Sequence, residues 1–412
     1  MREASTQQMG RRRSAGRAAV PADEETPGAA RLGVYLRKLR EGYGYTLRKV
    51  EEQAVSVGEA IDNSQLSRFE KGKAIPSFDK LRALARVFNV PVQNFSDVLD
   101  LEAYQDLKPS VESYADLLRA GAEFMARGEA GQAFVTYERA LEIAEATTVE
   151  AERVERVAEV RWRMACALKA LGKLFMAERE LREILRDRER LAPKTQLRSL
   201  LQLGYLYREL GDLYLASVIA RECLALAREQ DDLSTQAGVL NSLANILNDS
   251  GRTAEALERY REALAVLDKL DGYPEMKVTV MANLGGCLVA TGQFELGLSM
   301  LQTAGAKAQD EGFRRVAALA QTRLAEAWTR HGDTARAREC LAESDALASR
   351  VEGSFHDILF LNAYQRWRLV RDEDNSTGEK IAFGRLRHLR SLLQRRFPEV
   401  DEFDRHVERN RR

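Results

Sequence analysis

Three asparagines in the middle of the chain form the pattern that most directly suggests a binding chemistry. Asn241, Asn245 and Asn248 are separated by four and three residues, which places them on one face of a helix. Asparagine is a poor helix former, so an ordinary solvated face would be built more favourably from Glu or Lys. Because a carboxamide both donates and accepts hydrogen bonds, the row is suited to hold the main chain of an extended peptide.

Polar residues on the same and neighbouring helices would extend this surface. They are Gln202, Tyr205, Arg208, Asn283 and Arg323. An arginine at such a position can pair with a peptide carboxylate or an acidic side chain. The alternative is that the amides bond to adjacent helices, or that they line a wet groove without a ligand.

The sequence offers no comparable pattern for catalysis. It has neither a GxxxxGK[ST] nor an HExxH motif, and its four histidines are scattered. Its four cysteines lie 53 to 64 residues apart, too far for a CxxC pair. They fit helix interiors, where a free thiol acts as a small apolar group. We therefore expect no enzyme activity, no metal and no cofactor.

The composition indicates an all-α protein of the cytoplasm. Only eight of the 412 residues are proline, and Ala, Leu, Arg and Glu recur where a sheet would need runs of Val, Ile and Thr. No stretch approaches the roughly 18 apolar residues of a membrane span, so we expect no membrane association. Free cysteines fit a reducing compartment.

The two parts of the chain differ in charge, although the formal net charge is zero. Residues 31–91 carry 12 Lys and Arg against seven Asp and Glu, whereas residues 101–412 carry 46 against 50. The positive surplus favours nucleic acid as a partner of the N-terminal region. An ordinary solvated surface is the alternative.

The elements that would position the N-terminal residues begin near residue 31. Residues 1–30 are expected to be a disordered basic arm. The apolar spacing over 31–98 predicts five short helices, with Thr46 capping the second and a residue of Asp62-Asn63-Ser64 capping the third. We expect a linker helix over residues 99–115.

From residue 116 the sequence repeats with a period near 40. Glycines recur between amphipathic segments at positions 128, 172, 211, 251, 292 and 332. A small residue lies seven positions before each glycine and another five positions after it, which would let two helices approach closely. Such a period indicates stacked helical hairpins. We expect six repeats over 116–350, then a degenerate repeat and C-terminal capping helices over 351–412.

This frame resembles the tetratricopeptide repeat, and residues 121–140, GAEFMARGEAGQAFVTYERA, match it most fully. The repeats here exceed the usual length of about 34 residues, the tryptophan position is mostly aliphatic, and the closing proline is absent. The resemblance implies a right-handed α-solenoid in which the first helix of each hairpin lines the concave side.

The N-terminal region resembles the XRE-type, phage-repressor-like helix-turn-helix family. The matching segments are LGVYLRKLREGYGYTLRKVEE, residues 32–52, and NSQLSRFEKGKAIPSFDKLRALARVFNV, residues 63–90. The resemblance implies that the third helix enters the DNA major groove and that Arg40 and Glu70 bridge the first and third helices. The implied base-reading residues are Asn63, Ser64, Gln65 and Arg68, and the implied phosphate-binding residues are Arg48, Lys71 and Lys73.

The segment before the third helix departs from the family pattern. Thr46 and Leu66 are 20 positions apart, more than the family pattern usually allows, so the turn before the third helix is longer than usual. A longer turn would still let the helices pack, but it would change how deeply the third helix inserts. A chain of this ancestry that no longer binds DNA is the alternative.

The combination of these two modules resembles the RRNPP family of bacterial peptide-pheromone receptors, which act in quorum sensing and include the arbitrium receptors of phages. The resemblance implies a homodimeric transcription regulator. A short oligopeptide in its concave groove would reposition paired helix-turn-helix domains on a double-stranded DNA operator. The alternative is a tetratricopeptide-type scaffold that binds a protein partner, with DNA binding secondary or lost.

Overall fold

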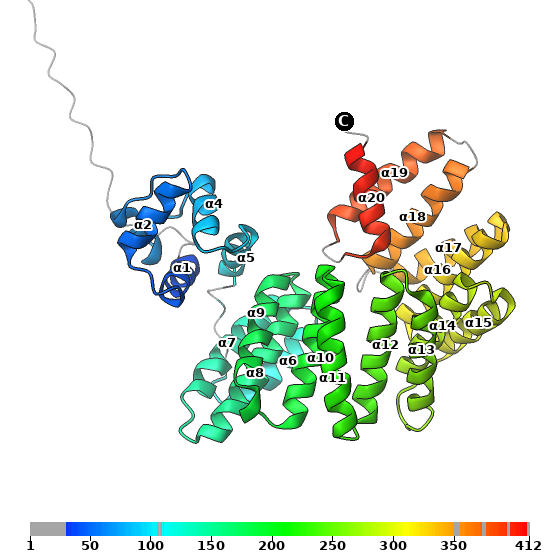
Figure 1. Ribbon diagram of the computed structural model, residues 1–412, viewed down its shortest axis with the longest axis horizontal. Helices are drawn as coiled ribbons and strands as arrows, with labels where there is room; N and C mark the ends of the chain where they lie inside the picture. Colours follow the sequence, from blue (N-terminus) through cyan, green and yellow to red (C-terminus); the bar gives the residue numbers. More distant parts are fainter. Residues whose placement is uncertain are drawn as a thin grey trace, which may run out of the picture. The chain divides into compact units, whose positions relative to one another are not determined.

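The computed structural model describes residues 30–104, 107, 109, 111–349, 355–372, 376–393 and 396–409. Within these residues every regular element is a helix (Figure 1), which confirms the all-α prediction. The chain divides into two units, residues 1–107 and 108–412, and each is described by itself. The predicted N-terminal arm lies outside the described residues except for Ala30.

The first unit contains the five short helices that the apolar spacing predicts. They are α1 (Ala30–Gly42), α2 (Leu47–Ser56), α3 (Asn63–Glu70), α4 (Phe78–Val87) and α5 (Gln93–Glu102). The predicted caps are present: the Thr46 side chain accepts a hydrogen bond from the Lys49 amide, and the Asp62 side chain accepts one from the Gln65 amide. Each cap satisfies a helix N–H that would otherwise have no partner.

The predicted linker helix over residues 99–115 is wrong. Helix α5 ends at Glu102, and the next helix begins at Tyr114. Pro109 has no N–H to donate within a helix. The Ser113 side chain accepts a hydrogen bond from the Asp116 amide and so caps the start of the following helix.

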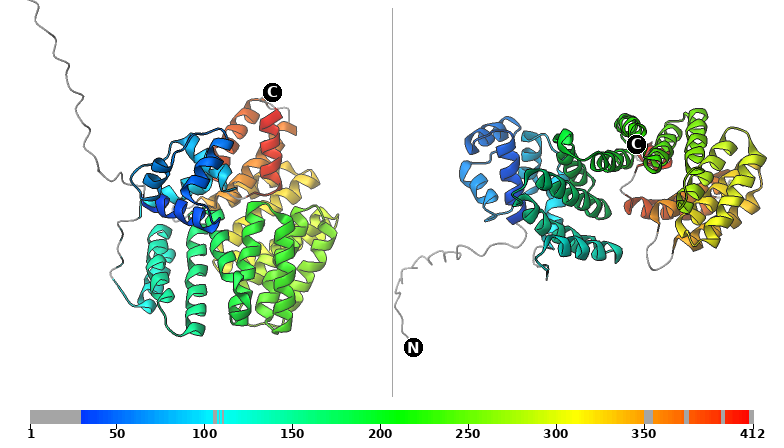
Figure 2. Two further views of the ribbon diagram at one scale, coloured as in Figure 1. Left: turned by 60° about the vertical axis from the view of Figure 1, so that its left-hand side comes forward. Right: turned by 90° about the horizontal axis from the view of Figure 1, so that it is seen from below.

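The second unit consists of helical hairpins stacked side by side (Figures 1 and 2). Six hairpins match the six predicted repeats: α6 (Tyr114–Ala126) with α7 (Ala130–Glu145), α8 (Glu150–Ala170) with α9 (Leu174–Arg186), α10 (Pro193–Leu210) with α11 (Leu213–Glu229), α12 (Leu233–Asp249) with α13 (Thr253–Leu267), α14 (Pro274–Ala290) with α15 (Phe294–Asp310), and α16 (Arg314–His331) with α17 (Thr334–Ala348). A short 3₁₀ turn, η1 (Arg188–Arg190), follows α9.

The recurring small residues explain why these hairpins form. All six glycines between paired helices have positive φ, from 74° to 88°, a backbone conformation that glycine adopts without strain. The small residues predicted seven positions before and five positions after them are all buried. The close packing of the paired helices therefore depends on these recurring small residues, as the sequence predicts.

Three further helices, α18 (His356–Asp372), α19 (Ser376–Ser391) and α20 (Pro398–Arg409), follow the sixth hairpin. They share an aromatic core in which Phe360, Trp367 and Phe403 are almost fully buried. The prediction of a degenerate repeat and C-terminal capping helices falls on these three helices. No helix in the described part of the chain is both long and apolar enough to cross a membrane.

Candidate functional site

Helix α3 has a polar face toward solvent and an apolar face that packs in the first unit. Leu66 and Phe69 are buried in the first unit, whereas Asn63, Ser64 and Arg68 are all exposed. Gln65 is half-buried because Lys80 of α4 donates a hydrogen bond to its Oε1 at 3.0 Å. The four residues predicted to read bases therefore lie on one short helix.

The C-terminal end of α3 is fixed to α1 by the predicted ion pair and by a close backbone approach. Arg40 Nε and Nη2 donate to the two carboxylate oxygens of Glu70 at 2.6 and 2.9 Å, and this hydrogen bonding raises the pKa of Arg40. Gly33 of α1 lies so close that a Cβ there would be 2.6 Å from the Phe69 carbonyl oxygen. These contacts set the orientation of α3.

The long turn between α2 and α3 is anchored in the core of the unit. It comprises residues 57–62, six where the motif usually has three or four. Gly58 has a φ of +91°, and the Ile61 side chain is 1% exposed. The extra residues thus bury an apolar side chain of their own while both helices pack against the unit.

Three further cations are predicted to bind phosphates. Arg48 on α2 is exposed, with 82% of its side chain accessible, and it forms a weak ion pair with Glu52 at 3.5 Å. Lys71 and Lys73 follow α3 directly and are exposed. Exposed Lys and Arg can contact phosphates without sequence preference, whereas amides and guanidinium groups on a helix can reach base edges. The role of these residues in DNA binding stays a prediction.

A groove in the second unit collects most of the polar residues predicted to bind peptide. It has a volume of about 370 Å³. The predicted residues that line it are Arg208, Asn241, Asn245, Asn248, Asn283 and Arg323. They come from α10, α12, α14 and α16, each the first helix of its hairpin. Gln202 and Tyr205, predicted for the same surface, are not among its lining residues.

The asparagines of the groove bond to neighbouring helices. Asn283 Nδ2 donates to Asn241 Oδ1 at 3.2 Å, and the buried Tyr260 hydroxyl donates to Asn245 Oδ1 at 2.9 Å. The Cys287 thiol lies 3.4 Å from Asn248 Oδ1. These contacts use amide acceptors, and the half-exposed Asn245 and Asn248 remain accessible from the groove.

Charged groups of both signs surround the amides. Arg208 is paired with Asp249 at 2.8 Å. Arg323 lies 3.8 Å from Glu326, and its buried Nε has no hydrogen-bond partner among the described residues. Burial raises the pKa of Glu399, and Glu326 acts in the same direction. The groove therefore presents amides together with charged groups of both signs.

Sequence spacing does not reveal the contribution of the C-terminal region to this groove. Phe397, Pro398 and Glu399 line it together with residues of α18. Next to it, Thr322 donates to the fully buried Asn362 at 2.8 Å. No short-range sequence pattern identifies these residues, because only the stacking of the hairpins brings them near α12.

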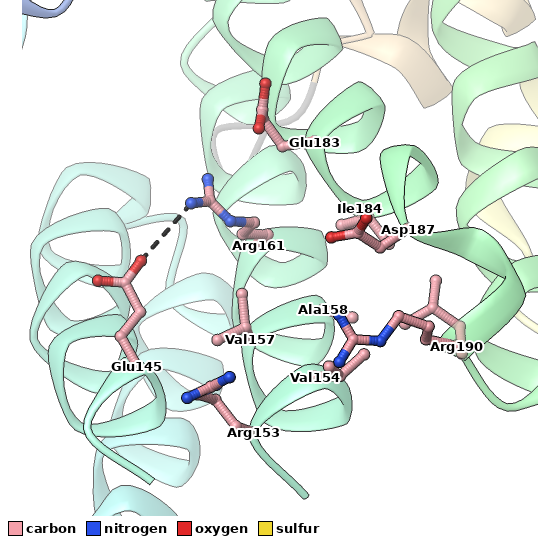
Figure 3. Close-up of a pocket in the computed structure, with 11 residues that line it drawn as sticks. Glu145, Arg153, Val154, Val157, Ala158, Arg161, Glu183, Ile184, Asp187 and Arg190 are labelled. Carbon is pink, nitrogen blue, oxygen red and sulfur yellow. Dashed lines mark ion pairs between the residues drawn. The ribbon is translucent and has the colours of Figure 1, made fainter. Parts of the chain in front are cut away.

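A second pocket of about 320 Å³ lies among α7, α8 and α9 (Figure 3). Its apolar lining includes Val154, Val157 and Ile184. Arg161 at its edge pairs with Glu145 at 3.6 Å, as drawn in Figure 3, and with Glu180 at 2.5 Å. This cation is therefore already paired with two carboxylates.

Comparisons with known proteins agree with this organisation. A helix-turn-helix family model matches residues 36–95, and a tetratricopeptide-repeat model matches residues 195–269. No curated protein matches the sequence.

Several solved structures share the fold. Aspartyl phosphate phosphatase F from Bacillus subtilis is 11% identical, with 93% of this chain and 98% of that chain covered and a TM-score of 0.57. A Rap protein complexed with competence and sporulation factor is 16% identical, with 88% and 100% covered and a TM-score of 0.54. The Rap conjugation gene regulator of plasmid pLS20, in complex with the Phr* peptide, is 15% identical, with 88% and 96% covered and a TM-score of 0.52. The chain therefore joins a helix-turn-helix domain to tetratricopeptide repeats, in the order that its motifs predict.

Proposed function

We propose that this protein is a DNA-binding transcription regulator whose repeat unit senses a short peptide. The observation that carries the proposal is the groove in which Asn241, Asn245, Asn248 and Asn283 converge, in a chain that also carries a helix-turn-helix domain. Amides that donate and accept hydrogen bonds fit the repeating backbone of an extended peptide. No catalytic step forms part of this proposal.

The outer face of α3 supports the DNA-binding half. Asn63 and Arg68 are both exposed on a helix whose other face is buried, and such side chains can bond to adenine and guanine edges in the major groove. We further propose that the protein acts in the cytoplasm as a homodimer on two half-sites about 10 bp, or a multiple of that, apart.

Structures of the same fold support the peptide half. One Rap protein was solved with competence and sporulation factor, and the regulator of plasmid pLS20 was solved with the Phr* peptide. We propose that a peptide signal, as in quorum sensing, binds the groove here. A peptide shifts the protein between states only if it binds one of them more tightly.

The DNA half is tested with the intact chain and a pool of random duplexes, from which bound sites are selected and sequenced. Arg68→Ala is expected to reduce the sequence preference at one base pair. Lys71→Ala is expected to weaken binding to all sites and to lower the slope of log binding constant against log salt concentration by about one. If Arg68→Ala retains the preference of the original protein at every position, α3 does not read DNA as proposed.

The peptide half is tested with a pool of synthetic heptapeptides, from which bound members are identified by mass spectrometry. Asn245→Ala is compared with Tyr260→Phe, which breaks the same internal hydrogen bond but keeps the amide. Loss of an amide contact should weaken binding about two- to tenfold in Asn245→Ala only. Equal affinities in the two variants would assign Asn245 a structural role.

A scaffold that binds a protein partner is the second candidate. The internal hydrogen bonds of the asparagines favour it, because they give these residues a role in joining hairpins without any ligand. This candidate predicts that no heptapeptide binds the groove and that a folded partner does.

A further inference from the structure

Residues 396–399, named here the C-terminal strap, connect the end of the array to its third hairpin. The Arg396 amide donates a hydrogen bond to the carbonyl oxygen of Glu209, near the end of α10, at 3.0 Å. The Arg396 side chain packs on Gly211, where an added Cβ would lie 3.2 Å from Arg396 Cβ. The strap therefore reaches from the capping helices to α10.

The other end of the strap is anchored in the aromatic core of the cap. The Phe397 ring is buried and contacts Phe360, with their centroids 5.8 Å apart. Val400, in the first turn of α20, is fully buried, and Figure 1 shows α20 beside α18 and α19. A segment held at both ends in this way forms a wall of the groove.

The strap forms part of the lining of the groove. Phe397, Pro398 and Glu399 all line it. Glu399 and Arg323 both line this groove, so the strap places a carboxyl group on the surface that would face a peptide. With the strap in place the volume is about 370 Å³, near the lower end of the roughly 300–1,000 Å³ typical of ligand pockets.

An extended peptide would have to run along the surface that the strap lines. Its backbone advances about 3.3 Å per residue, so seven residues span more than about 20 Å at that rise. We propose that the C-terminal strap closes the groove and that an extended peptide must displace it to bind. This inference rests on the proposed peptide sensing, and it predicts that weakening the strap increases peptide affinity, because less of the protein is then held in a state that cannot bind.

The test compares two substitutions at Arg396 in the intact chain. Arg396→Pro removes the N–H that bonds to Glu209, whereas Arg396→Ala keeps it and removes only the side chain, including an exposed ion pair with Asp401. Hydrogen exchange of the segment that follows residue 396 reports strap opening without a ligand. Affinity is measured for a heptapeptide selected from the synthetic pool by the original protein, and Phe397→Ala serves as a second way to loosen the strap.

The proposal expects faster exchange and about two- to tenfold tighter peptide binding in Arg396→Pro than in Arg396→Ala, and the same direction in Phe397→Ala. Unchanged exchange in Arg396→Pro would show that the bond to Glu209 does not hold the strap. Faster exchange with equal or weaker binding would show that the strap is a fixed wall of the site, which overturns displacement. If no heptapeptide binds any form, the proposed peptide sensing fails, while the exchange comparison still reports on closure.

Discussion

Substitution of Gly33 by alanine tests whether α1 holds the C-terminal end of α3 by direct backbone contact. A Cβ at Gly33 would lie 2.6 Å from the Phe69 oxygen, 2.8 Å from the Glu70 oxygen and 2.9 Å from the Gly72 nitrogen. All three are backbone atoms, which cannot rotate away as a side chain can. Overpacking of this kind costs about 1–3 kcal/mol, so α3 must shift or the first unit must lose stability by about that amount.

The chain offers a matched control in the same helix. Gly42 ends α1, has no neighbouring atom within 4 Å of the position that a Cβ would take, and does not have a positive φ. Gly42→Ala should therefore be neutral or stabilise the unit by up to about 1 kcal/mol, because alanine favours helix.

The assay is hydrogen exchange of the α1 and α3 amides in the intact chain. A loss of about 1–3 kcal/mol corresponds to exchange about 5- to 150-fold faster. Tryptophan fluorescence is an internal control, since Trp162, Trp328 and Trp367 all lie in the second unit and should show unchanged unfolding. Equal protection in Gly33→Ala and Gly42→Ala would refute the reasoning about close contact.

Three further predictions concern the second unit. Burial raises the pKa of Cys223 to about 12 and that of Cys287 to about 11, so native protein at pH 8 should resist iodoacetamide at both thiols, measured by peptide mass spectrometry; rapid labelling would contradict this burial. Burial also raises the pKa of Glu399, so its ionisation opposes folding as pH rises through the range between its ordinary and its raised pKa. Glu399→Gln should thus raise the melting temperature at pH 7, and by a smaller amount at pH 4. An equal increase at both pH values would contradict the raised pKa of Glu399. Asn245→Ala leaves the buried Tyr260 hydroxyl unpaired and should cost about 1–3 kcal/mol in denaturant unfolding, more than Tyr260→Phe, which leaves an amide that water can reach; the reverse order would contradict the assignment of Tyr260 as the buried partner.

Much of this architecture could be predicted because it depends on local spacing. Thr46 and Asp62 cap helices through their own nearby amides, and the turn glycines need only a left-handed backbone. The Arg40–Glu70 pair was predictable from resemblance. The convergence of the asparagines on one groove with Asn283 followed from the repeat period, because equivalent positions on successive hairpins face the same side.

The parts that could not be predicted depend on how the hairpins stack over a long range. Glu399 reaches the groove only because the array curves enough for the strap to bond to Glu209, and no periodic pattern encodes that curvature. Gln202 and Tyr205 share the predicted surface with Arg208 but lie outside the pocket; the Gln202 amide faces Cys166 of α8, and the Tyr205 hydroxyl lies beside Gly238 of α12. The prediction of a helix over residues 99–115 is wrong for a local reason. Pro109 has no N–H to donate within a helix, and the Ser113 side chain caps the start of α6.

The internal bonds of the asparagines determine how a ligand would gain affinity in this groove. A peptide N–H that bonds to Asn245 Oδ1 must share or replace the acceptor already used by Tyr260, so that bond is an exchange and contributes less than its full strength. The larger effect falls on a wrong ligand, because displacing these bonds without replacing them leaves buried groups such as the Tyr260 hydroxyl unpaired, at a cost of about 1–3 kcal/mol each. In such a groove, the free energy that a mismatched peptide loses at an unpaired buried group would exceed the free energy that a matched peptide gains from the same bond. The heptapeptide pool should therefore yield few sequences with a shared backbone register, and a broad set of unrelated binders would contradict the role given to the amides.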